Sequence, residues 1–187
     1  MTNNKYLNDY ITATVKGLER VKANGTKDEW HFEIDCGAIE DFHNREIKYD
    51  DKYAPIYERL KSVHGPVLYW MQIMSDVSTE EITKTLLQYK NGKDARSTPS
   101  LKKHINFNTG MLYAELTTEP LWVRLVQHLG FYESSAVQGL QLFYWATELK
   151  LKLRVTVLEF NGDMGDVLPL IEDAFARKLQ PLLGKVK

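Results

Sequence analysis

The sequence predicts an α/β domain in which a small mixed sheet is flanked by helices, preceded by an N-terminal α+β extension. The first supporting observation is a near-continuous apolar run at 67–74, which is typical of a strand covered on both faces. The second is a pair of further strand patterns, at 111–116 and 152–160. The third is the helical spacing of apolar residues between and after these strands. They predict one layered domain over residues 65–187, in which strands 67–74 and 111–116 are neighbours.

The first 64 residues form the predicted α+β extension, a domain of its own. Their hydrophobic pattern changes from the three-and-four spacing of a helix to the alternation of a half-buried strand. A polar stretch without periodicity follows, and Pro55 then precedes a short helix. The expected elements are a helix at 4–21, a strand at 29–35, a loop at 41–52 and a helix at 56–63.

Helices are expected to separate the strands of the larger domain. Ser78 followed by Glu81 is a capping-box pattern, which predicts a helix that begins there. Pro120 in a first turn and Gly130 after a last turn predict the bounds of another helix. The other expected segments are helices at 118–129, 136–149 and 165–179.

The charge balance excludes a uniformly basic nucleic-acid coat protein, although it leaves room for a local basic patch. The 187 residues contain 24 Lys and Arg against 25 Asp and Glu, a formal net charge of -1. Residues 84–104 hold six basic residues against Asp94 alone, a net charge of +5. This segment is either a solvated linker or a surface that contacts phosphates. Its basic residues are Lys84, Lys90, Lys93, Arg96, Lys102 and Lys103.

The sequence lacks the features of a membrane or secreted protein. No apolar run approaches the roughly 18 residues that a membrane-spanning helix needs. The first residues lack the apolar segment of a signal peptide, and Cys36 is the only cysteine, so no internal disulfide is expected. We therefore expect a cytoplasmic protein with no membrane partner, whose oligomeric state the sequence leaves open.

Few residue patterns suggest catalysis. The five histidines lack the paired spacing of metal ligands, and no glycine-rich phosphate loop occurs. Arg124 and His128 are four residues apart, so they share one face of the helix predicted at 118–129. An arginine fork suits phosphate oxygens, and a histidine transfers protons near neutral pH. The alternative is a solvent-facing arginine beside a partly buried histidine.

Four segments carry a further pattern, in chain order. Two lie on predicted strands, Gly65-Pro-Val-Leu-Tyr69 and Leu112-Tyr113-Ala114-Glu115. One lies on a predicted helix, Leu121-Trp-Val-Arg124-Leu-Val-Gln-His128-Leu-Gly130. The last is Ile171-Glu172-Asp173-Ala-Phe175, followed by Leu179-Gln-Pro181-Leu-Leu-Gly184. Over residues 65–184 this order resembles the GIY-YIG nuclease superfamily, with a helix-containing insertion at about 78–109.

The resemblance implies a metal-dependent endonuclease that hydrolyses phosphodiester bonds, with nucleic acid, DNA above all, as partner. In that case Glu172 binds one divalent cation, Mg²⁺ or Mn²⁺. Tyr69 helps to activate the attacking water, and Arg124 neutralises charge on the phosphoryl oxygens. Tyr113 and His128 position the reactants or share protons.

One residue departs from that pattern. Glu115 stands where the second motif has glycine, and its carboxylate would repel a phosphate. The departure favours a first alternative, a catalytically inactive GIY-YIG-like protein that binds nucleic acid through residues 84–103. The second alternative is a protein-interaction module built on residues 1–64, with Trp30 and Phe32 on its partner surface.

Overall fold

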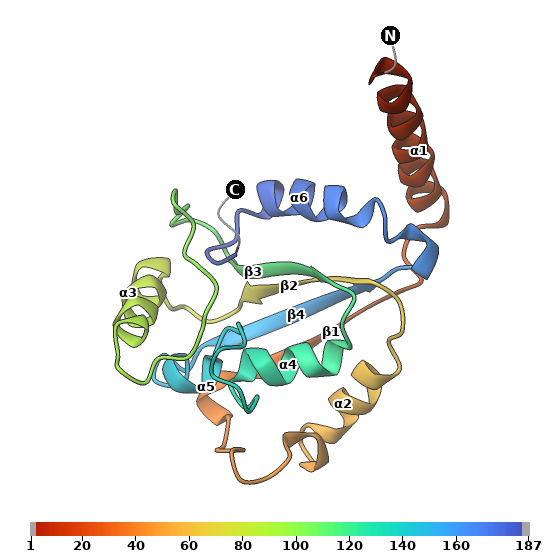
Figure 1. The fold of residues 1–187 in the computed structure, drawn as a ribbon. Helices are drawn as coiled ribbons and strands as arrows, with labels where there is room; N and C mark the ends of the chain where they lie inside the picture. Colours follow the sequence, from red (N-terminus) through yellow and green to blue (C-terminus); the bar gives the residue numbers. More distant parts are fainter. Residues whose placement is uncertain (1–2, 185–187) are drawn as a thin grey trace.

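The computed structural model describes residues 3–184 and forms one layered α/β body from which a single helix projects (Figure 1). Residues 1–2 and 185–187, at the outer ends of the two predicted domains, lie outside the described range. Within that range the chain contains one four-stranded antiparallel sheet and six α-helices. The strands, in their order across the sheet, are β1 (Asp28–Asp35), β4 (Lys152–Glu159), β2 (Val67–Ile73) and β3 (Met111–Thr117).

The sheet is antiparallel throughout, so the prediction of a mixed sheet was wrong. Strand β4 runs antiparallel to both of its neighbours, β1 and β2, and β2 runs antiparallel to β3. The apolar run of β2 reflects its cover of helices on both faces, and such burial does not require a parallel neighbour. The predicted pairing of β2 with β3 is confirmed, with Val67 opposite Thr117.

Both predicted domains contribute strands to this sheet. Strand β1, from the first 64 residues, pairs along its whole length with β4, from Asp28 opposite Glu159 to Asp35 opposite Lys152. The short helix of the same segment, α2 (Ala54–Lys61), buries Tyr57 and Leu60 in the main core. The segment before residue 65 is thus packed into the body by its strand and its second helix.

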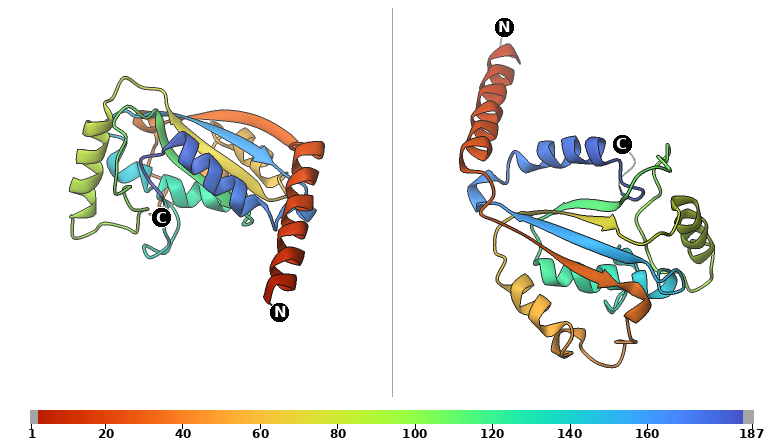
Figure 2. Two further views of the ribbon diagram at one scale, coloured as in Figure 1. Left: turned by 90° about the horizontal axis from the view of Figure 1, so that it is seen from above. Right: turned by 180° about the vertical axis from the view of Figure 1, so that it is seen from behind.

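Helices cover both faces of the sheet (Figures 1 and 2). On one face, α2, α4 (Leu121–Leu129) and α5 (Leu142–Trp145) enclose the larger core, which includes Tyr69 and Met71 of β2. On the other face, α6 (Leu168–Leu179) packs on a smaller core that includes Leu68 of β2. Helix α3 (Thr79–Lys90) contacts α5 beyond the end of the sheet.

Helix α4 is fixed by both its pattern and its ends. Leu121, Leu125 and Leu129 recur four residues apart and are all buried. Gly130 ends the helix with a φ of 105°, a left-handed conformation that glycine adopts without strain. The adjoining flank of the helix carries Arg124 and His128, and both side chains point toward Glu115 of β3.

The helix predicted at 136–149 is much shorter, because only Leu142–Trp145 is α-helical. Residues 136–141 instead form an irregular loop against α4. Gly139 permits this close approach, because any Cβ there would lie 2.1 Å from the Gln127 carbonyl oxygen. Leu140 in this loop is fully buried. The apolar pattern thus reported burial correctly, and it was wrong about the backbone conformation.

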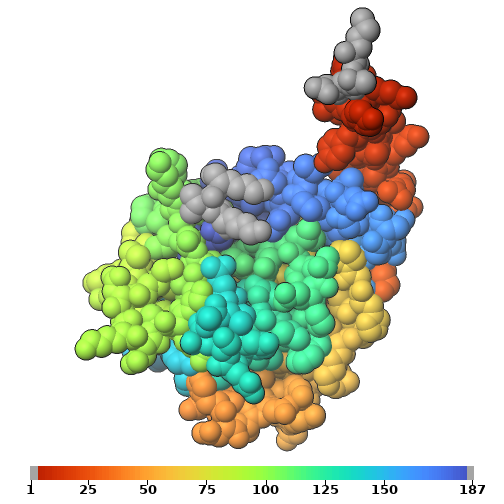
Figure 3. Space-filling model, viewed as in Figure 1, coloured from red at the N-terminus to blue at the C-terminus, as the bar shows by residue number. Residues whose placement is uncertain are grey.

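The remaining segments are the two ends of the described chain. After α6, Leu182 and Leu183 donate backbone hydrogen bonds to the carbonyl oxygens of Met111 and Leu112 on β3, at 2.9 and 3.0 Å. At the other end, α1 (Asn3–Asn24) stands clear of the body (Figure 3). Among residues 3–184, no helix has the length and apolar character needed to cross a membrane.

Candidate functional site

Three elements bring four of the five predicted site residues into one cluster. Strand β2 supplies Tyr69, strand β3 supplies Tyr113, and helix α4 supplies Arg124 and His128. The Tyr113 ring lies 5.2 Å from the His128 ring and 6.4 Å from the Tyr69 ring, between centroids. The residues that are widely separated in the sequence are therefore neighbours in the fold.

A β-bulge helps to aim Tyr113 into this cluster. Met71 pairs with Tyr113, whereas the next residue of β2 pairs with Met111, so Leu112 is the extra residue. Leu112 and Tyr113 consequently both pack in the larger core, although consecutive residues of a regular strand face opposite ways. Beyond the bulge, Glu115 follows Tyr113 by two residues and therefore lies on the same face of β3.

Glu115 is the centre of the cluster. Its carboxylate accepts hydrogen bonds from Arg124, with Nη2 at 2.8 and 3.0 Å from the two oxygens and Nε at 3.2 Å from one of them. It also accepts a hydrogen bond from the Tyr69 hydroxyl. The Arg124 side chain is only 11% exposed and that of Glu115 23%. This carboxylate therefore occupies the hydrogen-bonding fork of the arginine.

The hydrogen bonds assign the tautomer of His128. Its Nδ1 accepts a hydrogen bond from the backbone N–H of Leu140 at 3.2 Å, so the proton of the neutral ring lies on Nε2. Nε2 lies 2.6 Å from the Tyr69 hydroxyl oxygen and donates to it. Tyr69 in turn donates to Glu115, which gives a relay from His128 through Tyr69 to the carboxylate. Each polar group in this relay is thus satisfied within the chain.

The charges of the cluster follow from burial and from these contacts. Burial alone raises the pKa of the Glu115 carboxyl, but hydrogen bonds from His128 and Tyr69 and the positive charge of Arg124 outweigh it and lower the pKa to about 2. Burial lowers the pKa of His128, which keeps its ring neutral. Burial and the charge of Glu115 raise the pKa of the Tyr69 hydroxyl well above its usual value. The cluster at neutral pH is one ion pair with a neutral histidine and a protonated tyrosine.

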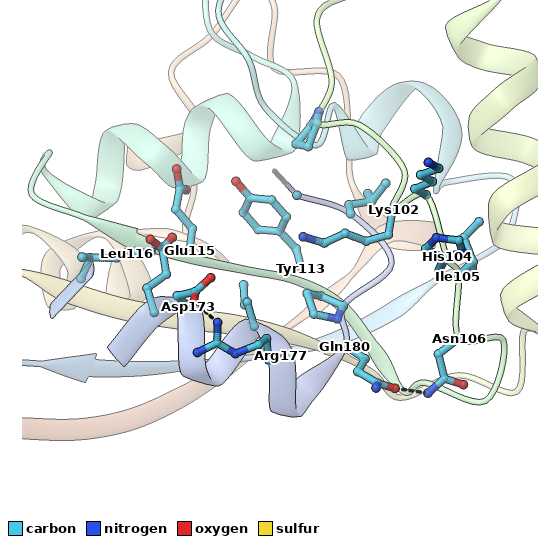
Figure 4. Close-up of a pocket in the computed structure, with 18 of the residues that line it drawn as sticks. Lys102, His104, Ile105, Asn106, Tyr113, Glu115, Leu116, Asp173, Arg177 and Gln180 are labelled. Atoms are coloured by element: carbon cyan, nitrogen blue, oxygen red, sulfur yellow. Dashed lines mark hydrogen bonds and ion pairs between the residues drawn. The ribbon is translucent and has the colours of Figure 1, made fainter. Parts of the chain in front are cut away.

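A pocket of about 610 Å³ opens over this cluster at the outer side of β3 (Figure 4). Strand β3 contributes Tyr113 and Glu115 to its wall, and α6 contributes Glu172. One Glu172 oxygen, Oε1, accepts a hydrogen bond from the backbone N–H of Leu116 at 3.0 Å, which holds the side chain against β3. All five predicted site residues are therefore in or directly beneath one pocket: Tyr113 and Glu172 line it, and Tyr69, Arg124 and His128 surround the carboxylate of Glu115.

The six basic residues of 84–104 divide into three groups. Lys102 and Lys103 line the pocket, together with His104. Lys90 and Arg96 serve structure: Lys90 Nζ donates to Thr98 Oγ1 at 2.8 Å, and an Arg96 Nη donates to the backbone oxygen of Tyr132. Lys84 and Lys93 are exposed and do not line the pocket. The linker thus presents its charge to the pocket mainly through Lys102 and Lys103, joined there by Arg177 of α6.

The pocket offers few ligands for a metal. In the described part of the chain, no three or more His, Cys, Asp or Glu side chains gather closely enough to hold an ion. Glu172 provides a carboxylate that suits a hard cation such as Mg²⁺, if solvent and a bound phosphate complete the coordination. This donor set fits only a loosely held cation.

The sequence did not identify every contact of the site. The Arg124 guanidinium also donates to the Gln127 side chain and, at 3.3 Å, to the backbone oxygen of Gln138. Gln127 lies three residues after Arg124 on the same helix, so helical spacing gave a signal for it. The Gln138 carbonyl and the Leu140 N–H are backbone groups of an irregular loop, and no side-chain pattern encodes them.

Comparisons with protein-family models, with curated proteins and with solved structures found no match to this chain.

Proposed function

We propose that this chain is a GIY-YIG-like nucleic-acid-binding protein whose phosphodiester-cleaving centre is blocked by its own Glu115 carboxylate. One observation carries the proposal: the Glu115 carboxylate accepts hydrogen bonds from the Arg124 guanidinium and from the Tyr69 hydroxyl at the same time. A planar anion with two hydrogen-bonding oxygens satisfies an arginine fork as a phosphate would. The groups that the resemblance assigns to the scissile phosphate are therefore already bound to an anion of the chain.

The energetics favour this closed arrangement over catalysis. A phosphate that approaches Arg124 meets a carboxylate in a partly buried environment, where like charges repel strongly. The Tyr69 side chain is fully buried, and its hydroxyl donates a hydrogen bond to Glu115. This hydroxyl is therefore not available to activate a water molecule. Catalysis would require that Glu115 leave the fork, which breaks several charge-assisted hydrogen bonds at once.

The pocket rim supports the binding part of the proposal. Lys102, Lys103 and Arg177 line a pocket that is large enough for a nucleotide unit. Lysine and arginine side chains bind backbone phosphates mainly through charge, which gives salt-sensitive and weakly sequence-dependent affinity. The rim can therefore contact a strand while the Arg124 fork stays occupied.

Cleavage assays test the block. Wild-type protein with Mg²⁺ or Mn²⁺ is expected to leave single- and double-stranded DNA and RNA intact, whereas Glu115→Gly is expected to cleave at least one of them. The double variants Glu115→Gly/Arg124→Ala and Glu115→Gly/Glu172→Ala should remove that activity, because they delete the cationic fork and the proposed metal ligand. Circular dichroism checks that each variant is folded. Cleavage by the wild type would contradict the block.

Binding assays test the rim separately. Fluorescence anisotropy with labelled DNA and RNA, over a range of salt concentrations, is expected to show salt-sensitive binding by the wild type. Lys102→Glu/Lys103→Glu should weaken it and reduce the salt slope by about one unit for each lost phosphate contact. Lys150→Glu/Lys152→Glu is the matched control, since both lysines are exposed and lie outside the pocket. Equal effects of the two pairs would refute a binding role for this rim.

A second function, a metal-dependent nuclease that is active as it stands, is favoured by a different observation. Glu172 and Tyr113 line the same pocket, as the resemblance requires for a metal ligand and a positioning group. In that case binding of substrate and Mg²⁺ displaces Glu115 from Arg124. Wild-type cleavage that Glu172→Ala abolishes, in a variant that still binds nucleic acid, would select this function over the blocked one.

A further inference from the structure

Helix α1 is an amphipathic helix whose apolar side is not covered by the rest of the chain. Its 22 residues extend over roughly 33 Å at the usual rise of an α-helix. Contact with the body is confined to its second half, where Gly17 lies against Val167 and Val21 packs on the smaller core. The first half projects away from every other element (Figures 1, 2 and 3).

The exposed side of α1 carries large apolar side chains. Tyr6 and Tyr10 are 74% and 69% exposed, and four aliphatic residues beside them are exposed by more than a third. Such a helix gains most of its stability when its apolar stripe is packed, because tertiary packing of an amphipathic face contributes more than intrinsic helix propensity. The six residues of the stripe are Tyr6, Leu7, Tyr10, Ile11, Val15 and Leu18.

The stripe is large enough to supply much of a dimer interface. An interface of standard size takes roughly 800 Å² from each partner, and six large side chains exposed by 37% to 74% provide a substantial part of it. A scattered exposed leucine needs no explanation, but a continuous apolar strip over most of a helix marks an interaction surface. The surface is long, narrow and helical, so its natural complement is another helix.

We propose that α1 pairs antiparallel with α1 of a second copy of this chain. Four of the six apolar positions are self-complementary about the midpoint between Thr12 and Ala13, while Ile11 lies opposite Thr14 and Tyr6 opposite Glu19. Leu7 then meets Leu18 of the second copy, and Tyr10 meets Val15. Because the same contacts recur on both sides of the midpoint, the pairing closes on itself as a two-fold interface.

The polar side of α1 agrees with a protein partner. It carries charges of both signs, with Asp9 and Glu19 among its lysines, whereas a helix that binds an anionic lipid surface is dominated by basic residues. Near its base, Arg20 pairs with Asp163 at 3.6 Å, which helps to fix the direction in which α1 leaves the body. The helix is thus presented to a second copy in one orientation.

Sedimentation equilibrium of the full chain tests the pairing. The wild type is expected to be a dimer, and Ile11→Glu should raise the dissociation constant roughly tenfold or more, because it places a charge within the apolar contact. Thr12→Glu is the matched control: it adds the same charge one residue away, on the polar side, and should change the constant less than about twofold. The proposal would be overturned by a wild type that stays monomeric over a 100-fold range of concentration centred on about 10 μM, or by equal effects of the two variants.

Disulfide trapping tests the antiparallel register. Leu7→Cys/Leu18→Cys should give a covalent dimer on mild oxidation, whereas Leu7→Cys alone should not, because the two copies of residue 7 lie about 16 Å apart along the paired helices. The native Cys36 is fully buried and does not compete. Efficient trapping by Leu7→Cys alone would overturn the antiparallel register. Binding of the monomer to anionic phospholipid vesicles, without any dimer in solution, would overturn the proposed partner.

Discussion

The most consequential residue of the candidate site is Glu115, because a single carboxylate holds three elements together. It connects the arginine of α4, the tyrosine of β2 and its own strand β3. A buried ion pair of this kind adds little net stability compared with an apolar substitute, yet removal of one partner leaves the other charge unpaired and is strongly destabilising. The block proposed for the cleavage centre is therefore also a structural contact.

Glu115→Gln is expected to lower the free energy of unfolding by about 2–4 kcal/mol at neutral pH, since Arg124 then keeps its charge without a counter-ion. Urea denaturation measures the change. Glu33→Gln is the matched control, because Glu33 forms an exposed ion pair with Arg154 at 2.9 Å and should change stability by less than about 1 kcal/mol. Equal losses in the two variants would show that the Glu115 contact is no stronger than a surface pair.

The same substitution has a defined pH dependence. The pKa of Glu115 is lowered from 4.5 to about 2 in the folded chain, so its contribution is fully present above about pH 4.5 and disappears as pH falls toward 2. The stability difference between wild type and Glu115→Gln should therefore shrink by roughly 3 kcal/mol across that interval. Urea denaturation repeated at several pH values measures it. A difference that is constant with pH would mean that the carboxylate charge is not responsible.

At the scale of residues, the sequence predicted which side chains lie together better than it predicted what each of them contacts. The spacing of Arg124 and His128 predicted one helix face, and both do belong to one cluster. Their partner was harder to foresee, because a strand residue two positions after Tyr113 faces the site only if the strand is covered by α4 on that side. The tautomer of His128 depends on the Leu140 N–H, a backbone group that carries no side-chain signal.

Among the elements, the loop at 136–141 shows where local pattern and tertiary contact diverge. Its apolar residues predict the first part of a helix, and Leu140 is indeed buried, but the backbone is irregular and packs on α4. The close approach of Gly139 to the Gln127 carbonyl and the hydrogen bond of Leu140 to His128 outweigh a weak helical preference. The start of α3 and the end of α4 were predictable because capping residues act within one turn: Ser78 accepts from the Glu81 N–H, and Gly130 ends α4 in a left-handed conformation. The start of α4 was predicted three residues too early, because the helix begins at Leu121, after Pro120.

Gly139→Ala is expected to destabilise the fold by about 1–3 kcal/mol, because its Cβ would lie 2.1 Å from a backbone oxygen of α4 that cannot move away freely. Gly110→Ala is the matched control, since nothing lies within 4 Å of its Cβ position. Thermal unfolding compares them, and the imidazole NMR signals of His128 should shift only in the first variant. If both variants unfold at the wild-type temperature, the close approach at residue 139 does not constrain the loop.

For the molecule as a whole, burial of its single thiol offers a measure of global stability. Cys36 is fully buried, and burial raises the pKa of its thiol to about 12. The thiolate, the reactive form, is therefore scarce at neutral pH, and a reagent reaches the sulfur only when the structure opens.

Labelling of wild-type Cys36 with a thiol reagent at pH 8 is expected to be slow in buffer and to accelerate with urea in proportion to the fraction unfolded. A Leu87→Cys variant serves as the positive control, because residue 87 on α3 is 43% exposed, lies outside the proposed α1 pairing and should react at once. Mass spectrometry distinguishes the two sites. Rapid modification of Cys36 in native wild type would show that the segment after β1 opens independently of the rest of the fold.

For the fold as a whole, features that depend on residues close together in the sequence could be predicted, whereas features that depend on distant segments could not. Strand positions and the pairing of β2 with β3 followed from alternation, burial and the order of elements. The insertion of β4 between β1 and β2 did not, because the order of strands in a sheet depends on contacts between segments that here lie 80 residues or more apart in the sequence. The pocket likewise arises from four separate segments, and only its individual side chains are visible in the sequence.

The contacts of Leu182 and Leu183 with β3 bear on how the folded chain avoids polymerisation. A free strand edge is a template for further strands, and edge-to-edge stacking is a route to fibrils. The C-terminal segment occupies hydrogen-bonding positions of β3, while β1, at the other end of the sheet, presents exposed acidic side chains such as Glu29 and Glu33. One edge is thus protected by a short strap and the other by electrostatic repulsion. A chain truncated before Leu182 would lose the strap and become prone to ordered aggregation from the β3 side.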